Sequence, residues 1–133
     1  MATGKVVFVC LHGAAKSVIA ASVFDRLAEA RGLDVRATFA GTEPDPQIPQ
    51  KVAQSLRAEG VELGGVRPRR VTRDELARAR HIVSFGCDLT DLGGGAGVER
   101  WDDVPAVSDD YQKARDVIAS RVEALVEHLD TRR

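Results

Sequence analysis

The chain has 133 residues, 44% of them hydrophobic and 29% charged, with a formal net charge of -1. This length and apolar content predict one globular domain, residues 1–133, and the interspersed charges do not form the basic surface of a nucleic-acid-binding protein. The N-terminal apolar run is too short for a membrane span and lacks the features of a signal peptide, so we expect a cytoplasmic protein with no nucleic-acid or membrane partner.

The first expected strand runs from Lys5 to Cys10, a β-branched and aromatic stretch typical of a buried parallel strand. It ends on Cys10, just outside the carboxyl end of the strand, where doubly wound sheets bind their ligands. A helix is expected from Ser17 to Arg31, ended by Gly32 as a left-handed cap. The expected buried stripe of this helix is Ile19, Val23, Leu27 and Ala30.

The rest of the chain continues the alternation of strands and helices. The further elements expected are a strand from Asp34 to Ala40, a helix from Pro49 to Glu59, a short helix capped by Thr72 and ending near Ala79, a strand from His81 to Phe85, a short strand from Val98 to Trp101, and a last helix capped near Asp109 with the stripe Ala114, Val117, Ile118, Leu125 and Leu129. This order predicts an α/β fold with a four-stranded parallel sheet and helices on both faces.

The loop between Cys10 and Lys16 has the composition of an anion site. Its five short residues let successive backbone N–H groups point inward, and the following helix adds its positive N-terminal end. Such surroundings favour a thiolate at neutral pH, and a thiolate facing an oxyanion held by amides, a cation and a hydroxyl is a reaction site.

Two other kinds of site are disfavoured by spacing. A nucleotide-binding P-loop needs glycine where this chain has Cys10 and Ala15, although Lys16-Ser17 matches its last two residues. The spacing of the cysteines and histidines matches no structural zinc pattern, so no metal is expected.

A cysteine followed by five residues, a cation and a serine is the pattern of cysteine-based phosphatases. Near the start of so short a chain it resembles the low-molecular-weight phosphotyrosine phosphatase superfamily. Within that superfamily, four more stretches look like landmarks of the thiol-dependent arsenate reductases, and they are residues 40–44, 59–63, 82–87 and 101–106.

The resemblance implies a role for each matching residue. Cys10 is the implied nucleophile, and Ser17 the implied hydrogen-bond donor to its thiolate. Asp102 or Asp103 matches the acid that protonates the leaving oxygen. Cys87 matches a thiol that attacks the Cys10–arsenic adduct and forms a disulfide. The implied oxyanion-binding residues are Leu11, His12, Gly13, Ala14, Ala15, Lys16 and Ser17.

The chain departs from the family pattern in its loops and in its cysteine count. Lys16 stands where the family has arginine, so a point charge replaces a two-oxygen fork. The loop asparagine is missing, His12 adds bulk, and Val104 replaces the aspartate before the proline. With two cysteines in all, the chain lacks a third relay thiol. Either a thioredoxin-like protein is expected to reduce a Cys10–Cys87 disulfide directly, or a small thiol is expected to take the adduct. No bound cofactor is expected.

Two alternatives to an arsenate reductase stay open. One is a low-molecular-weight phosphatase that hydrolyses phosphotyrosine or another phosphomonoester, in which Cys87 needs no role. The other is an oxyanion-binding regulatory protein that has kept the fold but has weak or no turnover.

Overall fold

The computed structural model describes residues 5–93 and 97–131. Apart from a 3-10 helix at Thr90–Leu92, which the sequence pattern does not predict, its elements follow the expected alternation of strands and helices, and their observed bounds lie within two residues of the expected ones. In chain order they are β1 (Lys5–Cys10), α1 (Lys16–Ala30), β2 (Arg36–Gly41), α2 (Gln50–Ala58), α3 (Arg73–Arg78), β3 (His81–Ser84), the 3-10 helix η1 (Thr90–Leu92), β4 (Val98–Arg100) and α4 (Tyr111–Thr131).

The four strands form one parallel sheet in the order β2-β1-β3-β4. The chain passes from β1 to β2 on one side and later returns to β3 on the other side, so the order reverses at β1. In open α/β sheets the ligand crevice lies at such a reversal, outside the carboxyl ends of the strands. In the register, Cys10 pairs with Gly41 and Val9 pairs with Ser84, so the segments that follow β1, β2 and β3 all leave from this one edge.

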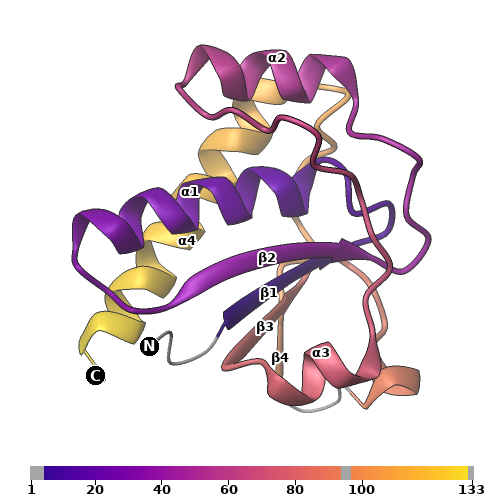
Figure 1. Ribbon diagram of the computed structural model, residues 1–133, viewed down its shortest axis with the longest axis vertical. Helices are drawn as coiled ribbons and strands as arrows, with labels where there is room; N and C mark the ends of the chain where they lie inside the picture. The colour runs from indigo at the N-terminus through magenta and orange to yellow at the C-terminus, as the bar shows by residue number, and fades with distance from the viewer. Residues whose placement is uncertain (1–4, 94–96, 132–133) are drawn as a thin grey trace.

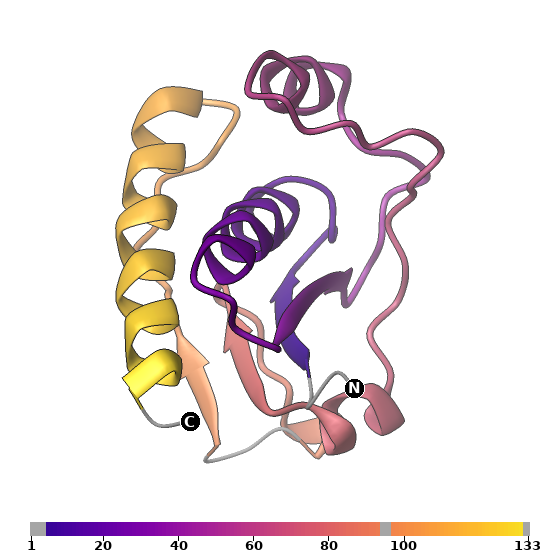
Figure 2. The same cartoon turned by 60° about the vertical axis from the view of Figure 1, so that its left-hand side comes forward.

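Helices cover both faces of the sheet, which confirms the predicted fold class. Figure 1 shows α1, α2 and α4 on one face and α3 on the other, and Figure 2 shows α1 lying between α4 and the strands. Side chains of β1 alternate between the two faces: Val6, Phe8 and Cys10 belong to the large core under α1 and α4, whereas Val7 and Val9 belong to a smaller core under α3.

The buried face of α1 is wider than the predicted stripe and rotated from it. Val23 and Leu27 are only partly buried and Ala30 is exposed, because α1 contacts both the sheet and α4 and buries the residues that face the two. Those residues are Ser17, Val18, Ile19, Ala20, Ala21, Phe24 and Ala28.

The end caps follow the predicted chemistry. Thr72 Oγ1 accepts a 3.1 Å hydrogen bond from the Glu75 N–H at the start of α3, and Gly32 takes a φ of 67° after α1. Asp110 accepts a 3.0 Å hydrogen bond from the Lys113 N–H at the start of α4. Among the helices that the structure describes, none has the length and apolar character needed to cross a bilayer.

Candidate active site

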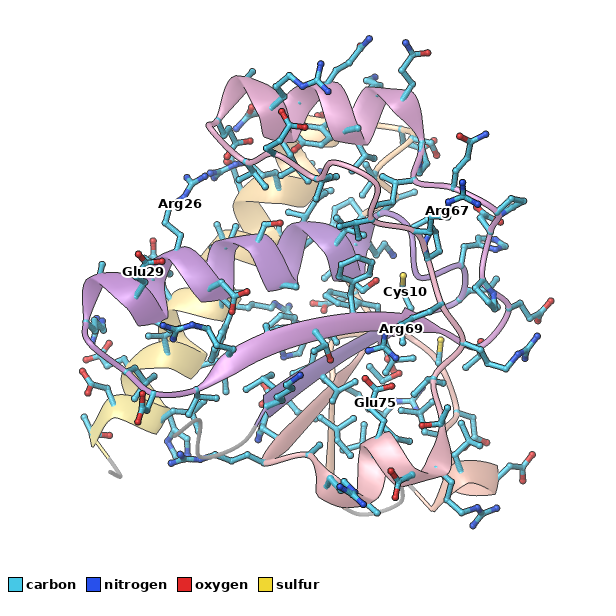
Figure 3. All side chains as sticks on the ribbon, viewed as in Figure 1. Cys10, Arg26, Glu29, Arg67, Arg69 and Glu75 are labelled. Carbon is cyan, nitrogen blue, oxygen red and sulfur yellow. The ribbon has the colours of Figure 1, made fainter. Side chains whose placement is uncertain are left out.

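Cys10 ends β1 beneath the first turn of α1 (Figure 3). Its Sγ lies 3.0 Å from the Oγ of Ser17, and both side chains are buried. The chain folds this way because the apolar residues of β1 hold Cys10 in the sheet while Ser17, in the first turn of α1, faces back towards it. A buried hydroxyl at this distance can donate a hydrogen bond to a thiolate and stabilise the charged form.

Two glycines let the loop after Cys10 lie against the end of β2. A Cβ atom built on Gly13 would lie 2.6 Å from the Gly41 nitrogen, and one built on Gly41 would lie 2.6 Å from the Gly13 nitrogen. Gly13 also has a φ of 59°, in the left-handed region that favours glycine. The two backbones therefore meet at a contact that no side chain can enter.

Main-chain hydrogen bonds extend this contact along the chain. The Glu43 N–H donates to the Leu11 carbonyl at 2.8 Å, and the Asp45 N–H donates to the His12 carbonyl at 3.1 Å. The segment after β2 is thus fixed alongside the loop that follows the cysteine. The His12 side chain reinforces this pairing, since its Nδ1 lies 3.3 Å from both the Glu43 carbonyl oxygen and Asp45 Oδ1.

The Lys16 side chain reaches the segment that follows β4. Its Nζ donates a 3.1 Å hydrogen bond to the Val104 carbonyl, and Lys16 also lines the cavity beside Cys10. The cation that was predicted to bind an oxyanion therefore has a second contact, one that a sequence pattern does not reveal.

Cys87 follows β3 and packs on the opposite face of the sheet from Cys10. It is buried in the smaller core with Val7 and Val9, while Cys10 belongs to the larger core. Burial raises the pKa of the Cys87 thiol above its ordinary value, and the nearby Cys10 adds to this shift. Ser84 fixes the local backbone, because its Oγ accepts from the Cys87 N–H at 2.9 Å and donates to the Cys87 carbonyl at 2.7 Å.

The two predicted acids lie outside the cavity and are paired with arginines. Asp102 Oδ2 accepts a 3.1 Å hydrogen bond from Arg100 Nε, and Asp103 Oδ2 accepts one of 2.7 Å from Arg121 Nη2. The hydrogen bond from Arg121 lowers the pKa of Asp103, so this carboxyl stays ionised and is a poor proton donor. Both residues are exposed in this structure.

A cavity of about 360 Å³ opens beside Cys10, with walls that are largely apolar. Several residues with functional groups line it that were not singled out from the sequence, notably Asp45, Lys51 and Ser108. Asp45 had an available signal, because it lies a few residues past β2 and parallel strands bring their carboxyl ends to one edge. The lining residues are Cys10, Leu11, His12, Ala14, Ala15, Lys16, Asp45, Pro49, Lys51, Val52, Phe85, Val107 and Ser108.

Of the predicted oxyanion-binding residues, five line this cavity, whereas Gly13 and Ser17 are buried and do not. The five are Leu11, His12, Ala14, Ala15 and Lys16. Across residues 5–93 and 97–131, no group of three or more His, Cys, Asp or Glu side chains is placed to hold a metal ion.

Fold and site together define a doubly wound α/β protein with a buried cysteine at the reversal of strand order, in a loop that leads into the first turn of a helix. The family model described as "Low molecular weight phosphotyrosine protein phosphatase" matches residues 5–89. The chain therefore belongs to the low-molecular-weight phosphotyrosine phosphatase family.

The named proteins that this chain resembles include both arsenate reductases and phosphatases. A Halobacterium salinarum protein named "Putative arsenate reductase" is 30% identical over 92 residues, which cover 68% of this chain and 65% of that protein. A low-molecular-weight phosphotyrosine phosphatase of Vibrio cholerae superposes with a TM-score of 0.83 at 20% identity, over 96% of this chain and 97% of that one. A thioredoxin-dependent arsenate reductase of Corynebacterium glutamicum superposes with a TM-score of 0.78 at 22% identity, over 98% of this chain and 63% of that one. The two structural likenesses show the fold.

Proposed function

We propose that this chain is an enzyme in which the Cys10 thiolate attacks a tetrahedral oxyanion, and that its reaction is the thiol-dependent reduction of arsenate. The observation that carries the proposal is the 3.0 Å contact between Cys10 Sγ and Ser17 Oγ, buried at the start of α1 and open to the cavity on the Cys10 side. Amides of residues 11–17 and the Lys16 cation hold the oxygens of the substrate in this proposal.

The reduction divides into two steps. The Cys10 thiolate attacks arsenic(V), an oxygen leaves as water after protonation, and a sulfur–arsenic bond forms. A second thiolate then attacks Cys10 Sγ, the sulfur–arsenic bond breaks with its electron pair going to arsenic, and arsenite leaves. Cys87 is the internal candidate for the second thiol, because it follows β3, whose carboxyl end lies at the same sheet edge as the end of β1 that carries Cys10. The arsenate reductase names among the relatives support this choice.

The electrons come from outside the chain. A thioredoxin-like protein reduces a Cys10–Cys87 disulfide in this scheme, or a low-molecular-weight thiol takes the place of Cys87 and attacks Cys10 directly. The Corynebacterium neighbour, which is thioredoxin-dependent, supports the first route. Both routes need reduced thiols at rest, so we place the reaction in the cytoplasm.

A second candidate function is favoured by the cavity. Its 360 Å³ and largely apolar walls, which include Val52, Phe85 and Val107, offer more room than an inorganic oxyanion fills. An organic phosphomonoester would place its apolar group there, and water would then hydrolyse the Cys10–phosphate bond. The phosphatases among the structural neighbours fit this candidate.

One set of assays separates the candidates. Arsenate-dependent oxidation of thioredoxin is expected for the wild-type chain and lost in Cys10→Ser and Cys87→Ser. Hydrolysis of an aryl phosphate that is lost in Cys10→Ser but kept in Cys87→Ser identifies a phosphatase. A Cys87→Ser chain that keeps full arsenate turnover with a small thiol removes the relay. A wild-type chain that binds phosphate but turns over neither substrate contradicts both enzymes and identifies an oxyanion-binding protein.

A further inference from the structure

Leaving-group departure in this site needs a proton donor, and the two predicted aspartates are not placed to provide one. Asp102 and Asp103 pair with arginines outside the cavity, and the pKa of Asp103 is lowered by Arg121. A donor must lie in the space that the substrate enters. The ionisable side chains that line the cavity with Cys10 are His12, Lys16, Asp45 and Lys51.

We propose that His12 is the proton-transfer residue of this site and that Asp45 is the residue that positions it. This inference rests on the proposed function, since it assigns a step of the same reaction. Histidine suits the task because its charge changes near neutral pH, so it can give a proton in one step and accept one in the next. Lys16 is less suited, because its Nζ is engaged with the Val104 carbonyl.

The contacts of Nδ1 fix the protonation pattern of the His12 ring. Nδ1 lies 3.3 Å from the Glu43 carbonyl oxygen and 3.3 Å from Asp45 Oδ1. A carbonyl oxygen can only accept, so Nδ1 carries a proton and donates in its contact with Glu43. Nε2 is then the ring nitrogen that is left to exchange a proton with the substrate in this proposal.

The backbone holds this pair in place. The Asp45 N–H donates to the His12 carbonyl at 3.1 Å, and the Gly13–Gly41 contact sets the two loops against each other one residue away. Main-chain hydrogen bonding therefore keeps the Asp45 carboxylate next to the His12 ring. Both residues line the cavity that Cys10 also lines. Both side chains are about half exposed, at 54% for His12 and 42% for Asp45, so the pair exchanges protons with water between turnovers.

In this proposal His12 transfers a proton to the leaving group of either a phosphate ester or arsenate. As the Cys10 thiolate attacks phosphorus, the ester bond breaks, its electron pair goes to the leaving oxygen, and that oxygen takes the proton from His12 Nε2. Nε2 then removes a proton from the water that attacks phosphorus, and Cys10 leaves as a thiolate. With hydrogen arsenate, the same proton goes to the departing hydroxyl group, the arsenic–oxygen bond breaks, and the hydroxyl leaves as water.

The test compares two phosphate esters that differ in their need for a proton. His12→Gln is expected to lower kcat/KM for phenyl phosphate by about 10²-fold or more, and to lower it less than about 10-fold for a dinitrophenyl ester, whose leaving group departs without help. Asp45→Asn is expected to show the same dependence with a smaller loss. His128→Gln, on the exposed part of α4, is the matched control and is expected to behave as wild type. The inhibition constant of inorganic phosphate checks that the loop is intact.

Imidazole rescue provides a readout that also works with arsenate. Added imidazole is expected to restore turnover of His12→Ala several-fold and to leave Cys10→Ser inactive. An equal loss for both esters without imidazole rescue overturns the role of His12. So does a leaving-group-dependent loss that appears in Asp102→Asn or Asp103→Asn instead. A wild-type chain that is inert towards both arsenate and phosphate esters refutes the proposed function itself, and with it the proton transfer.

Discussion

Lys16 and Val104 join the start of α1 to the segment that follows β4, through the 3.1 Å hydrogen bond from the lysine Nζ to the valine carbonyl. Lys16 also lines the cavity beside Cys10, so one side chain contacts both the reaction space and its border. An arginine in this place would offer two parallel N–H groups to an oxyanion, where lysine offers one charge. If Lys16 binds the oxyanion as proposed, it would control the orientation of the substrate less than an arginine would, while its hydrogen bond holds the Val104 segment next to the start of α1.

Replacing Lys16 tests this double role. Lys16→Met removes both the charge and the tie, and we expect turnover to fall about 10²-fold, the typical cost of losing one oxyanion donor. Lys16→Arg is expected to strengthen competitive inhibition by phosphate several-fold, because the guanidinium binds two oxygens. Lys113→Met, on the exposed face of α4, is the control. Unchanged phosphate inhibition in both Lys16 variants contradicts a contact between Lys16 and the oxyanion.

Ser17→Ala removes the hydroxyl that contacts the nucleophile. We expect Cys10 to react about 10-fold more slowly with iodoacetamide at pH 7, because the thiolate loses its hydrogen-bond donor. Mass spectrometry of the alkylated chain measures the rate at Cys10, and Ser120→Ala on α4 is the matched control. Equal alkylation rates in the wild type and in Ser17→Ala are incompatible with this role.

Gly41→Ala places a methyl group in the contact between the two loops. Its Cβ would lie 2.6 Å from the Gly13 nitrogen, so the backbone of one loop would have to move. We therefore expect the free energy of unfolding to fall by about 2 kcal/mol or more. Gly65→Ala is a close control, since its Cβ would meet nothing within 4 Å. Urea denaturation measures both variants. A Gly41→Ala chain as stable as Gly65→Ala shows that the loops can move apart.

Cys87 is expected to be a slow nucleophile in the resting chain. Burial favours its neutral thiol, so the thiolate fraction at neutral pH is below that of an ordinary exposed cysteine and grows as pH rises through the alkaline range. Alkylation of Cys87 in Cys10→Ser should therefore have its midpoint above the ordinary cysteine pKa. Denatured protein provides the reference midpoint. A native midpoint at or below that reference refutes the protective burial.

The parts of the fold that repeat a short pattern could be predicted from sequence. The continuous apolar run from Val6 to Val9 fixes β1 as a buried parallel strand, and Thr72 with Glu75 marks the start of α3. The buried face of α1 could not be predicted in the same way. Ala30 satisfies the helical period and is nevertheless exposed, because the packing of α1 against α4 and the sheet decides which residues are covered.

The same division applies to the site. The contact between Cys10 and Ser17 could be expected from the resemblance to the family, and the strand, loop and helix that hold the two residues are contiguous in the sequence. The pairing of His12 with Asp45 depends on a close approach of two loops more than 30 residues apart, and the pairing of Asp103 with Arg121 depends on where α4 passes. Such contacts follow from the tertiary packing, which a local motif does not contain.

Cys10 and Cys87 belong to cores on opposite faces of the sheet, and this has a redox consequence. The proposed bond between the two sulfurs would join side chains from the two cores, and any movement of Cys87 away from Val7 and Val9 would expose surface that the reduced fold buries. In the proposed relay, the packing free energy of the smaller core would therefore oppose the disulfide and raise its reduction potential. If the relay operates as proposed, the stability of the reduced fold itself would favour the return of both cysteines to free thiols after each turnover.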